Sequence, residues 1–411
     1  MKLLLINLIF FTCTLSYGQW DKSFGILNST LFDVEASTDG IVYAVGTDSV
    51  NYYINGSIFK SIDGGDTWFT VNHIVDSLGI GSYMTRVNII DSTRAFVSNR
   101  SPIVYRTTDA GLIWDTTHIP TGSGVITDAM HFLDNVTGFV GNHFGEIFKT
   151  IDGGLNWFLV HANPIFNPIT DISCPTNSTC YARTSMPNKL LKSIDGGNSW
   201  NVMPSAPNTY ITGGLHAINQ DTVIMVTSDS LIFRSLDGGS SWDTIPCPVY
   251  SNLLDVFFID NIGFAVGDLE TILKSVDYGE TWSVELHDSI SSEQITSIHM
   301  LNNTSAIACS NLGSIYRLGG FNSVDNLKIE ALTIDVYPNP FSENLIIHFS
   351  KHFSGVVNIH DALGRVVYTT SITNQNTVEL NLSKIDSDCL YLRFTDTDSG
   401  QIITKKIIGV Q

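Results

Sequence analysis

One stretch, FKSIDGGDTW at positions 59–68, returns five more times along the chain, and this repeat restricts the possible folds most strongly. The other copies are YRTTDAGLIW (105–114), FKTIDGGLNW (148–157), LKSIDGGNSW (191–200), FRSLDGGSSW (233–242) and LKSVDYGETW (273–282). Their aspartates are spaced 46, 43, 43, 42 and 40 residues apart. A period of this length, with several short apolar runs in each unit, is typical of the four-stranded blades of a β-propeller.

The number of blades follows from the strands that flank the six copies. Each unit holds four short runs rich in Val, Ile, Phe and Thr, separated by turn residues. After the last copy, QITSIHML, SAIACSN and SIYRLG supply three more strands. Trp20, the tryptophan outside the copies, lies near the N-terminus in a Trp-Asp pair like those after the second and fifth copies. We therefore expect an N-terminal strand to complete a seventh blade, which leaves no free sheet edge.

The repeated residues are suited to building a turn. Aspartate bonds nearby backbone N–H groups, glycine adopts the positive φ that a tight turn needs, and tryptophan fills the space between blades. The copies resemble the Asp-box, S/T-x-D-x-G-x-T/S-W, of sialidase-like, sortilin-like and photosystem-assembly-factor propellers. The resemblance implies a structural role, on the face opposite the usual ligand site, for Asp63, Gly65, Trp68, Asp109, Gly111, Trp114, Asp152, Gly154, Trp157, Asp195, Gly197, Trp200, Asp237, Gly239, Trp242, Asp277, Gly279 and Trp282.

The N-terminus and the cysteines indicate an exported protein. Residues 1–18 combine Lys2, an apolar run and small residues before the expected cleavage, which is typical of a secretory signal peptide. No later run approaches the ~20 apolar residues of a membrane helix. Cys174 and Cys180 bracket a short loop and are expected to be able to pair in an oxidising compartment. The state of Cys247, Cys309 and Cys389 stays open.

From about residue 332 the repeat gives way to alternating strands that are enough for a small β-sandwich. This segment resembles the type A sorting domain of the type IX secretion system, which implies passage through the periplasm to the cell surface or the medium, with the secretion machinery as a partner. The fold expected for the whole chain is therefore all-β, with a signal peptide (1–18), a seven-bladed propeller (19–320), a processing linker (321–331) and a sorting domain (332–411). The residues that carry this second resemblance are Tyr337, Pro338, Asn339, Pro340, Gly364, Lys405 and Lys406.

Charge and motifs exclude several functions. With 40 acidic and 21 basic residues the net charge is −19, which repels nucleic acid and anionic lipid. The eleven histidines show no metal-ligand spacing, and no phosphate loop occurs, so neither a metal nor a cofactor is expected. A sialidase would need an Arg-Ile-Pro motif and an arginine triad, and the sequence contains no Arg-Ile-Pro.

Two functions remain, and each has its own candidate residues. A polysaccharide hydrolase of the Asp-box kind would use two facing carboxylates, for which Glu146, Asp268 and Glu270, in loops between second and third strands, are the candidates. A non-catalytic module that binds protein or glycan would use aromatic side chains in the loops of the same face, and we favour this function for an expected monomer. The aromatic candidates, with one histidine, are Tyr52, Tyr53, Tyr83, His143, Phe144, Phe166, Tyr210 and Tyr250.

Overall fold

The computed structural model divides into two compact units between Ser323 and Val324. The expected linker, 321–331, lies outside the described residues, which contain strands and turns and no helix. The structure describes residues 20–23, 26, 29–50, 53–74, 83–121, 126–162, 167–185, 189–204, 207, 213–319, 334–337, 344–360, 365–383, 385, 389–396 and 402–408.

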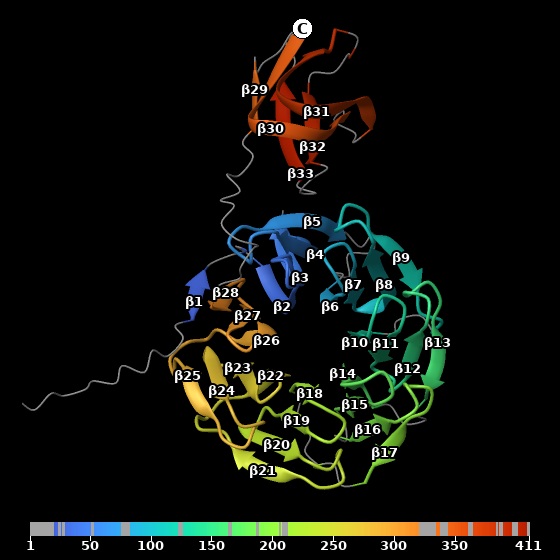
Figure 1. Ribbon diagram of the computed structural model, residues 1–411, viewed down its shortest axis with the longest axis vertical. Coiled ribbons are helices and arrows are strands. Elements are labelled where there is room, and N and C mark those ends of the chain that lie inside the picture. Colours follow the sequence, from blue (N-terminus) through green and yellow to red (C-terminus); the bar gives the residue numbers. More distant parts are fainter. Residues whose placement is uncertain are drawn as a thin grey trace, which may run out of the picture. The chain divides into compact units, whose positions relative to one another are not determined.

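The first unit is a ring of seven four-stranded antiparallel sheets, as the sequence predicts (Figure 1). The innermost strands are β2 (Ser29–Ala36), β6 (Met84–Ile89), β10 (Thr127–Phe132), β14 (Ile169–Ser173), β18 (Leu215–Ala217), β22 (Leu253–Ile259) and β26 (Ile295–Asn302). The second strands are β3 (Val42–Val50), β7 (Ala95–Asn99), β11 (Gly138–Asn142), β15 (Cys180–Thr184), β19 (Val223–Val226), β23 (Ile262–Gly267) and β27 (Ser305–Ser310).

The outer half of each blade contains the third and fourth strands. The third strands are β4 (Tyr53–Ser61), β8 (Ser101–Thr107), β12 (Ile147–Thr150), β16 (Leu190–Ser193), β20 (Leu231–Ser235), β24 (Thr271–Ser275) and β28 (Ile315–Leu318). The outermost strands are β5 (Phe69–Ile74), β9 (Asp115–His118), β13 (Phe158–His161), β17 (Asn201–Met203), β21 (Asp243–Pro246), β25 (Ser283–Leu286) and, in the seventh blade, β1 (Asp21–Ser23).

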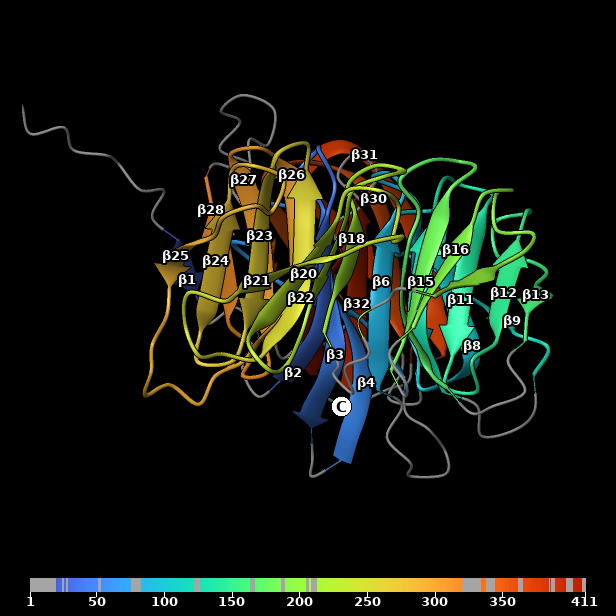
Figure 2. The same cartoon turned by 90° about the horizontal axis from the view of Figure 1, so that it is seen from below.

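The blades run from one face of the ring to the other (Figure 2). Because neighbouring strands are antiparallel, the first-to-second and third-to-fourth connections emerge on one face, which we call the turn face. The second-to-third connections and the links between blades emerge on the opposite face, which we call the loop face. The six repeated turns all connect third to fourth strands and therefore lie on the turn face.

Each repeated turn is held by its own aspartate, as blade 4 illustrates. Asp195 accepts hydrogen bonds from the Ser193 hydroxyl (2.8 Å), from the Ser199 amide (2.9 Å) and from the Ser199 hydroxyl (2.6 Å). These bonds hold the pKa of Asp195 below its usual value, so the carboxylate stays charged into acidic solution. Trp200 then packs edge-on against Phe139 of the preceding blade, with ring centroids 6.0 Å apart. The turn therefore both shapes one blade and contacts its neighbour.

Basic side chains on the third strands bind the turn of the next blade, and we call these contacts turn clasps. Lys149 donates to the carbonyl oxygen of Gly196 (2.8 Å), the residue after the turn aspartate. Corresponding bonds run from Lys60 to Ala110, Arg106 to Gly153 and Lys192 to Gly238, while Arg234 reaches Glu280 and Arg317 reaches Asp66. A position that is Lys or Arg in all seven blades thus makes an inter-blade contact in at least six of them.

The ring closes through the N-terminal strand. β1 pairs with β28 through Asp21, Lys22 and Ser23, and Trp20 packs edge-on against Phe264 of blade 6 at 5.4 Å. Trp20 therefore occupies the place that the turn tryptophans take in other blades.

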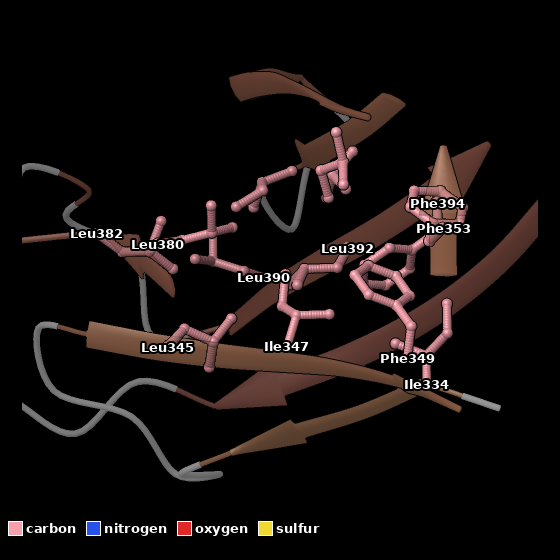
Figure 3. Packing of buried hydrophobic residues seen from close by; sticks show 13 residues of the cluster. Ile334, Leu345, Ile347, Phe349, Phe353, Leu380, Leu382, Leu390, Leu392 and Phe394 are labelled. Carbon is pink, nitrogen blue, oxygen red and sulfur yellow. The ribbon is translucent and has the colours of Figure 1, made fainter. Parts of the chain in front are cut away.

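In the second unit, strands β29 (Ile334–Tyr337), β30 (Asn344–His360), β32 (Cys389–Asp396) and β33 (Ile402–Ile408) form a sheet in that order, with β31 (Val366–Asn381) paired to β30. Both halves of β30 pair with β31, with a register shift between His348 and Gly355, while its other edge pairs first with β29 and then with β32. The sheet encloses its own core, in which Phe349 stacks on Phe353 and Phe394 packs edge-on (Figure 3).

Two neighbouring glycines of the blade 4 turn should differ in their tolerance of alanine. Both have positive φ, 72° at Gly196 and 78° at Gly197, but only a Cβ at position 197 would overlap the ring of Phe139. Ala110 and Tyr278 already occupy the position of Gly196 in other turns. We expect Gly196→Ala to lower the free energy of unfolding by about 1–2 kcal/mol and Gly197→Ala by about 3 kcal/mol or more. Urea denaturation of the two variants tests this order, and equal losses would contradict it.

Candidate functional site

The inner strands of all seven blades line a cavity of about 260 Å³ on the axis of the ring. Charged and polar side chains alternate along these strands with aliphatic residues that point into the blades. The polar lining consists of Asp33, Glu35, Arg86, Asn88, His131, Asp171, Ser173, His216, Asp255, Ser297 and His299. We call this region the axial channel.

Most of these side chains bind the backbone of the next blade. Asp33 accepts from the Val87 amide (2.9 Å), and Glu35 accepts from the Ile89 amide two residues further on (2.6 Å). The same contact recurs from Asn88 to Phe132, Asp171 to Leu215, Ser173 to Ala217 and Asp255 to Ile298. Since an inner strand has no neighbour on its axial side, these axial clasps satisfy amides that lie beside the channel.

Burial changes the protonation of the channel. It raises the pKa of Glu35 to about 8, with the nearby charge of Asp33 as the second cause, and it raises the pKa of Asp255 to about 7. Burial also raises the pKa of Asp33 and Asp171, although the positive charge of Arg86 opposes that shift. Arg86 itself donates one long hydrogen bond, 3.4 Å, to the carbonyl oxygen of Thr170.

Three histidines line the same channel and are neutral at physiological pH. Burial lowers the pKa of His131 to about 4, of His216 to about 3 and of His299 to about 4. The ring of Phe257 lies between two of them, 4.7 Å from His216 and 4.8 Å from His299. Among the described residues, His, Cys, Asp and Glu side chains form no group of three or more that could hold a metal ion.

The three acidic candidates lie on the loop face, but in different blades and with partners of their own. Glu146, in blade 3, accepts a hydrogen bond from Asn142 of its own hairpin (2.7 Å). Asp268, in blade 6, accepts from Asn252 (2.7 Å) and from Gln294 (2.9 Å), which belong to the loops on either side.

Glu270 is part of the ring closure. Its carboxylate accepts from Lys22 of β1 (3.0 Å), from the Ser291 hydroxyl (2.7 Å) and from the Tyr316 hydroxyl (3.1 Å). Lys22 also binds Glu293 at 2.7 Å, so one lysine joins two carboxylates. The backbone of Glu270 has a positive φ of 50°, next to Leu269 at 57°, and this hairpin turn presents the carboxylate to β1.

The aromatic candidates are divided over the loop face. Tyr83 packs near Phe32, with centroids 6.1 Å apart, and carries the guanidinium of Arg100 at 5.0 Å. The rings of His143 and Phe144 contact each other at a tilt of 33°, with centroids 4.2 Å apart. Tyr250 has 90 % of its surface exposed. Tyr52, Phe166 and Tyr210, and the side chain of Tyr53, lie outside the described residues.

Five loops over blades 5–7 form one hydrogen-bonded structure, which we call the rim: residues 227–230, 247–252, 268–270, 287–294 and 311–314. Backbone bonds connect each loop to the next, from Cys247 to Ser230, Asp268 to Asn252, Asp288 to Leu269 and Asn311 to Gln294, at 2.9–3.1 Å. Three large apolar side chains nevertheless point away from this structure. They are Tyr250, Ile290 (92 % exposed) and Leu312 (56 % exposed).

Sequence reasoning missed the axial channel and the two apolar rim residues Ile290 and Leu312. A signal for the channel exists, since DVE, RVN, DIS and SIH place polar residues two apart in the first strand of four blades. No comparable signal marks Ile290 or Leu312, because the sequence does not show which loop residues lack a packing partner.

Other predicted residues are placed as follows. Cys174 and Cys180 form a disulfide, Cys309 is a buried free thiol, and Cys247 is a half-buried one. In the second unit, Tyr337 and Lys405 are exposed, and the backbone of Lys406 pairs with Tyr391. Pro338, Asn339, Pro340, Gly364 and the side chain of Cys389 lie outside the described residues. None of the described segments forms a helix suited to crossing a membrane.

Comparison with protein families assigns the second unit. Residues 335–411 match the model of the secretion system C-terminal sorting domain. The chain is thus a β-propeller protein with a type IX sorting domain, and it is exported by that system to the cell surface or the medium. The resemblance and the localisation expected from the sequence are confirmed. Comparison with curated proteins gave no sequence match.

Solved structures confirm the propeller fold. YCF48 bound to a D1 peptide is similar with a TM-score of 0.62 at 17% identity, over 74% of this chain and 98% of that one. Virginiamycin B lyase from Staphylococcus aureus, an inactive variant with quinupristin, has a TM-score of 0.58 at 12% identity, over 73% and 99%. PorZ, a surface component of the type IX secretion system of Porphyromonas gingivalis, has a TM-score of 0.50 at 13% identity, over 90% and 58%. At these identities the likeness concerns the fold alone.

Glu35 should make the stability of the ring depend on pH. A carboxyl whose pKa is about 8 when folded and 4.5 when unfolded binds protons on folding, so its stabilising effect is complete below pH 4.5 and is lost as pH rises through 8. Glu35→Gln removes this titration. Relative to the variant, the wild type should lose up to about 1.4 kcal/mol of unfolding free energy per pH unit between pH 5 and 8. Urea denaturation across this range measures the difference, and parallel curves would contradict it.

Proposed function

We propose that this protein is a non-catalytic binding module that holds a polypeptide on the loop face of its propeller after export. The observation that carries the proposal is the exposure of Tyr250 and Ile290 on a rim whose loops are joined to one another by backbone hydrogen bonds. Large apolar side chains that stand free of the protein's own packing mark interaction sites when they gather on one surface. A rigid support lowers the entropy that a partner loses on binding them.

The contacts of the acidic candidates argue against the alternative, a polysaccharide hydrolase. General acid catalysis needs a carboxyl that can reach the substrate, and a glycosidase needs two such groups facing one bond. Asp268 and Glu270 are bound to neighbouring loops and to β1, while Glu146 lies three blades away in the ring. These partners give Asp268 and Glu270 a structural role, which is to join neighbouring loops and strands of the ring.

The proposal that the partner is a polypeptide is also supported by a protein of similar fold. In the structure of YCF48 with a D1 peptide, a propeller of the same architecture holds a peptide. This is an analogy between folds, and it adds to the argument from the rim without assigning the same partner.

The test measures peptide and glycan binding by the exported chain on arrays, with reducing-sugar release assayed on every glycan that binds. We expect peptides to bind, and the double variant Tyr250→Ala, Ile290→Ser to bind them about tenfold or more weakly, as truncation of central contacts does. The control is Ile194→Ser with Leu236→Ser, which removes two exposed aliphatic side chains (71% and 55% exposed) from the turn face. Glycan binding with sugar release, and no peptide binding, would refute the proposal.

A further inference from the structure

The rim carries an excess of negative charge beside its apolar side chains. Its five loops contain five acidic residues and no lysine or arginine, and Lys22 of β1, which contacts the rim, is already shared between Glu270 and Glu293. Two of the acids, Asp229 in the first loop of the rim and Asp288 in the fourth, are exposed. The five acids are Asp229, Asp268, Glu270, Asp288 and Glu293.

Each exposed acid of the rim lies next to an apolar side chain, in the same loop or in the loop bonded to it. Asp229 is in the loop that bonds to the loop of Tyr250, and Asp288 is two residues before Ile290, whose amide it accepts at 3.1 Å. Leu312 follows in the next loop, which is bonded to the same segment through Asn311 and Gln294. A partner that covers the apolar residues must therefore approach both carboxylates.

From this arrangement we infer that the rim docks a basic polypeptide segment, in which lysine or arginine residues flank apolar ones. The inference rests on the proposed function and names the chemistry of its partner. Acidic or anionic partners, including nucleic acid and anionic lipid, would meet like charge from the rim and from a chain of net charge −19. An uncharged apolar segment would cover Tyr250 and Ile290 but would leave Asp229 and Asp288 facing it without a counter-charge.

The exposed acids offer clean variants, because asparagine keeps the local hydrogen bonds. Asp229 accepts from the Thr227 hydroxyl (2.6 Å) and Asp288 from the Ile290 amide, and an amide oxygen accepts equally well at both places. Asp39→Asn makes the same charge change at an exposed residue in a first-to-second turn, on the opposite face. If only the two rim variants lose binding, the loss is due to the negative charge removed from the rim.

The experiment selects peptides from a random phage-displayed library against the exported chain and measures their affinity by fluorescence anisotropy at several salt concentrations. We expect the selected peptides to be rich in Lys and Arg next to apolar residues, and to bind more weakly as salt increases. Asp229→Asn and Asp288→Asn should each raise the dissociation constant about three- to tenfold and flatten its salt dependence, whereas Asp39→Asn should change neither. Tyr250→Ala should weaken the same peptides at every salt concentration.

The outcomes separate this inference from the proposed function. Peptides that lack basic residues, or that bind the two rim variants and the wild type equally, would overturn the inference, and the proposed function would stand if Tyr250→Ala still weakened them. Peptides insensitive to all rim variants, or an array that yields only glycans, would overturn both.

Discussion

The whole propeller depends on hydrogen bonds that join each blade to the next at two distances from the axis. Near the outside, a third-strand lysine or arginine binds the turn of the following blade, as Lys149 binds Gly196. On the axis, side chains such as Asp33 and Glu35 bind amides of the following inner strand. Apolar packing fills the space between the blades but has no direction. The two sets of hydrogen bonds add directional contacts between each blade and the next.

These inter-blade hydrogen bonds explain why some buried carboxyls of the ring resemble catalytic groups. A buried carboxyl with a raised pKa in a cavity, such as Glu35 or Asp255, is a common sign of an active site. Here both carboxyls accept amides of the next blade, so their burial follows from their place in the ring. Glu270 belongs with them, because it holds the N-terminal strand that closes the ring.

Because the blades of the closed ring are bonded to one another, we expect the functional site to lie in the loops. The type IX sorting domain delivers the propeller to the cell surface or beyond. The loop face of blades 5–7 then combines bonded loops with exposed Tyr250, Ile290 and Leu312. Both proposals follow from this contrast between loops that are hydrogen-bonded to one another and apolar side chains that stay exposed.

The repeat, the propeller and the sorting segment were predictable from sequence because their signals are local. Asp195 binds residues within four positions of itself, and each blade is a contiguous segment, so a short pattern carries the information. The roles of the acidic and aromatic residues on the loop face were not predictable, because they depend on which side chains contact one another in the folded protein. Lys22 and Glu270 are 248 residues apart, and Asp268 is bound from two different loops. The sequence by itself therefore determined the blades and the export of this protein. Only the tertiary structure decided which carboxylates hold the ring together and which apolar side chains stay exposed, because those roles depend on contacts between distant segments.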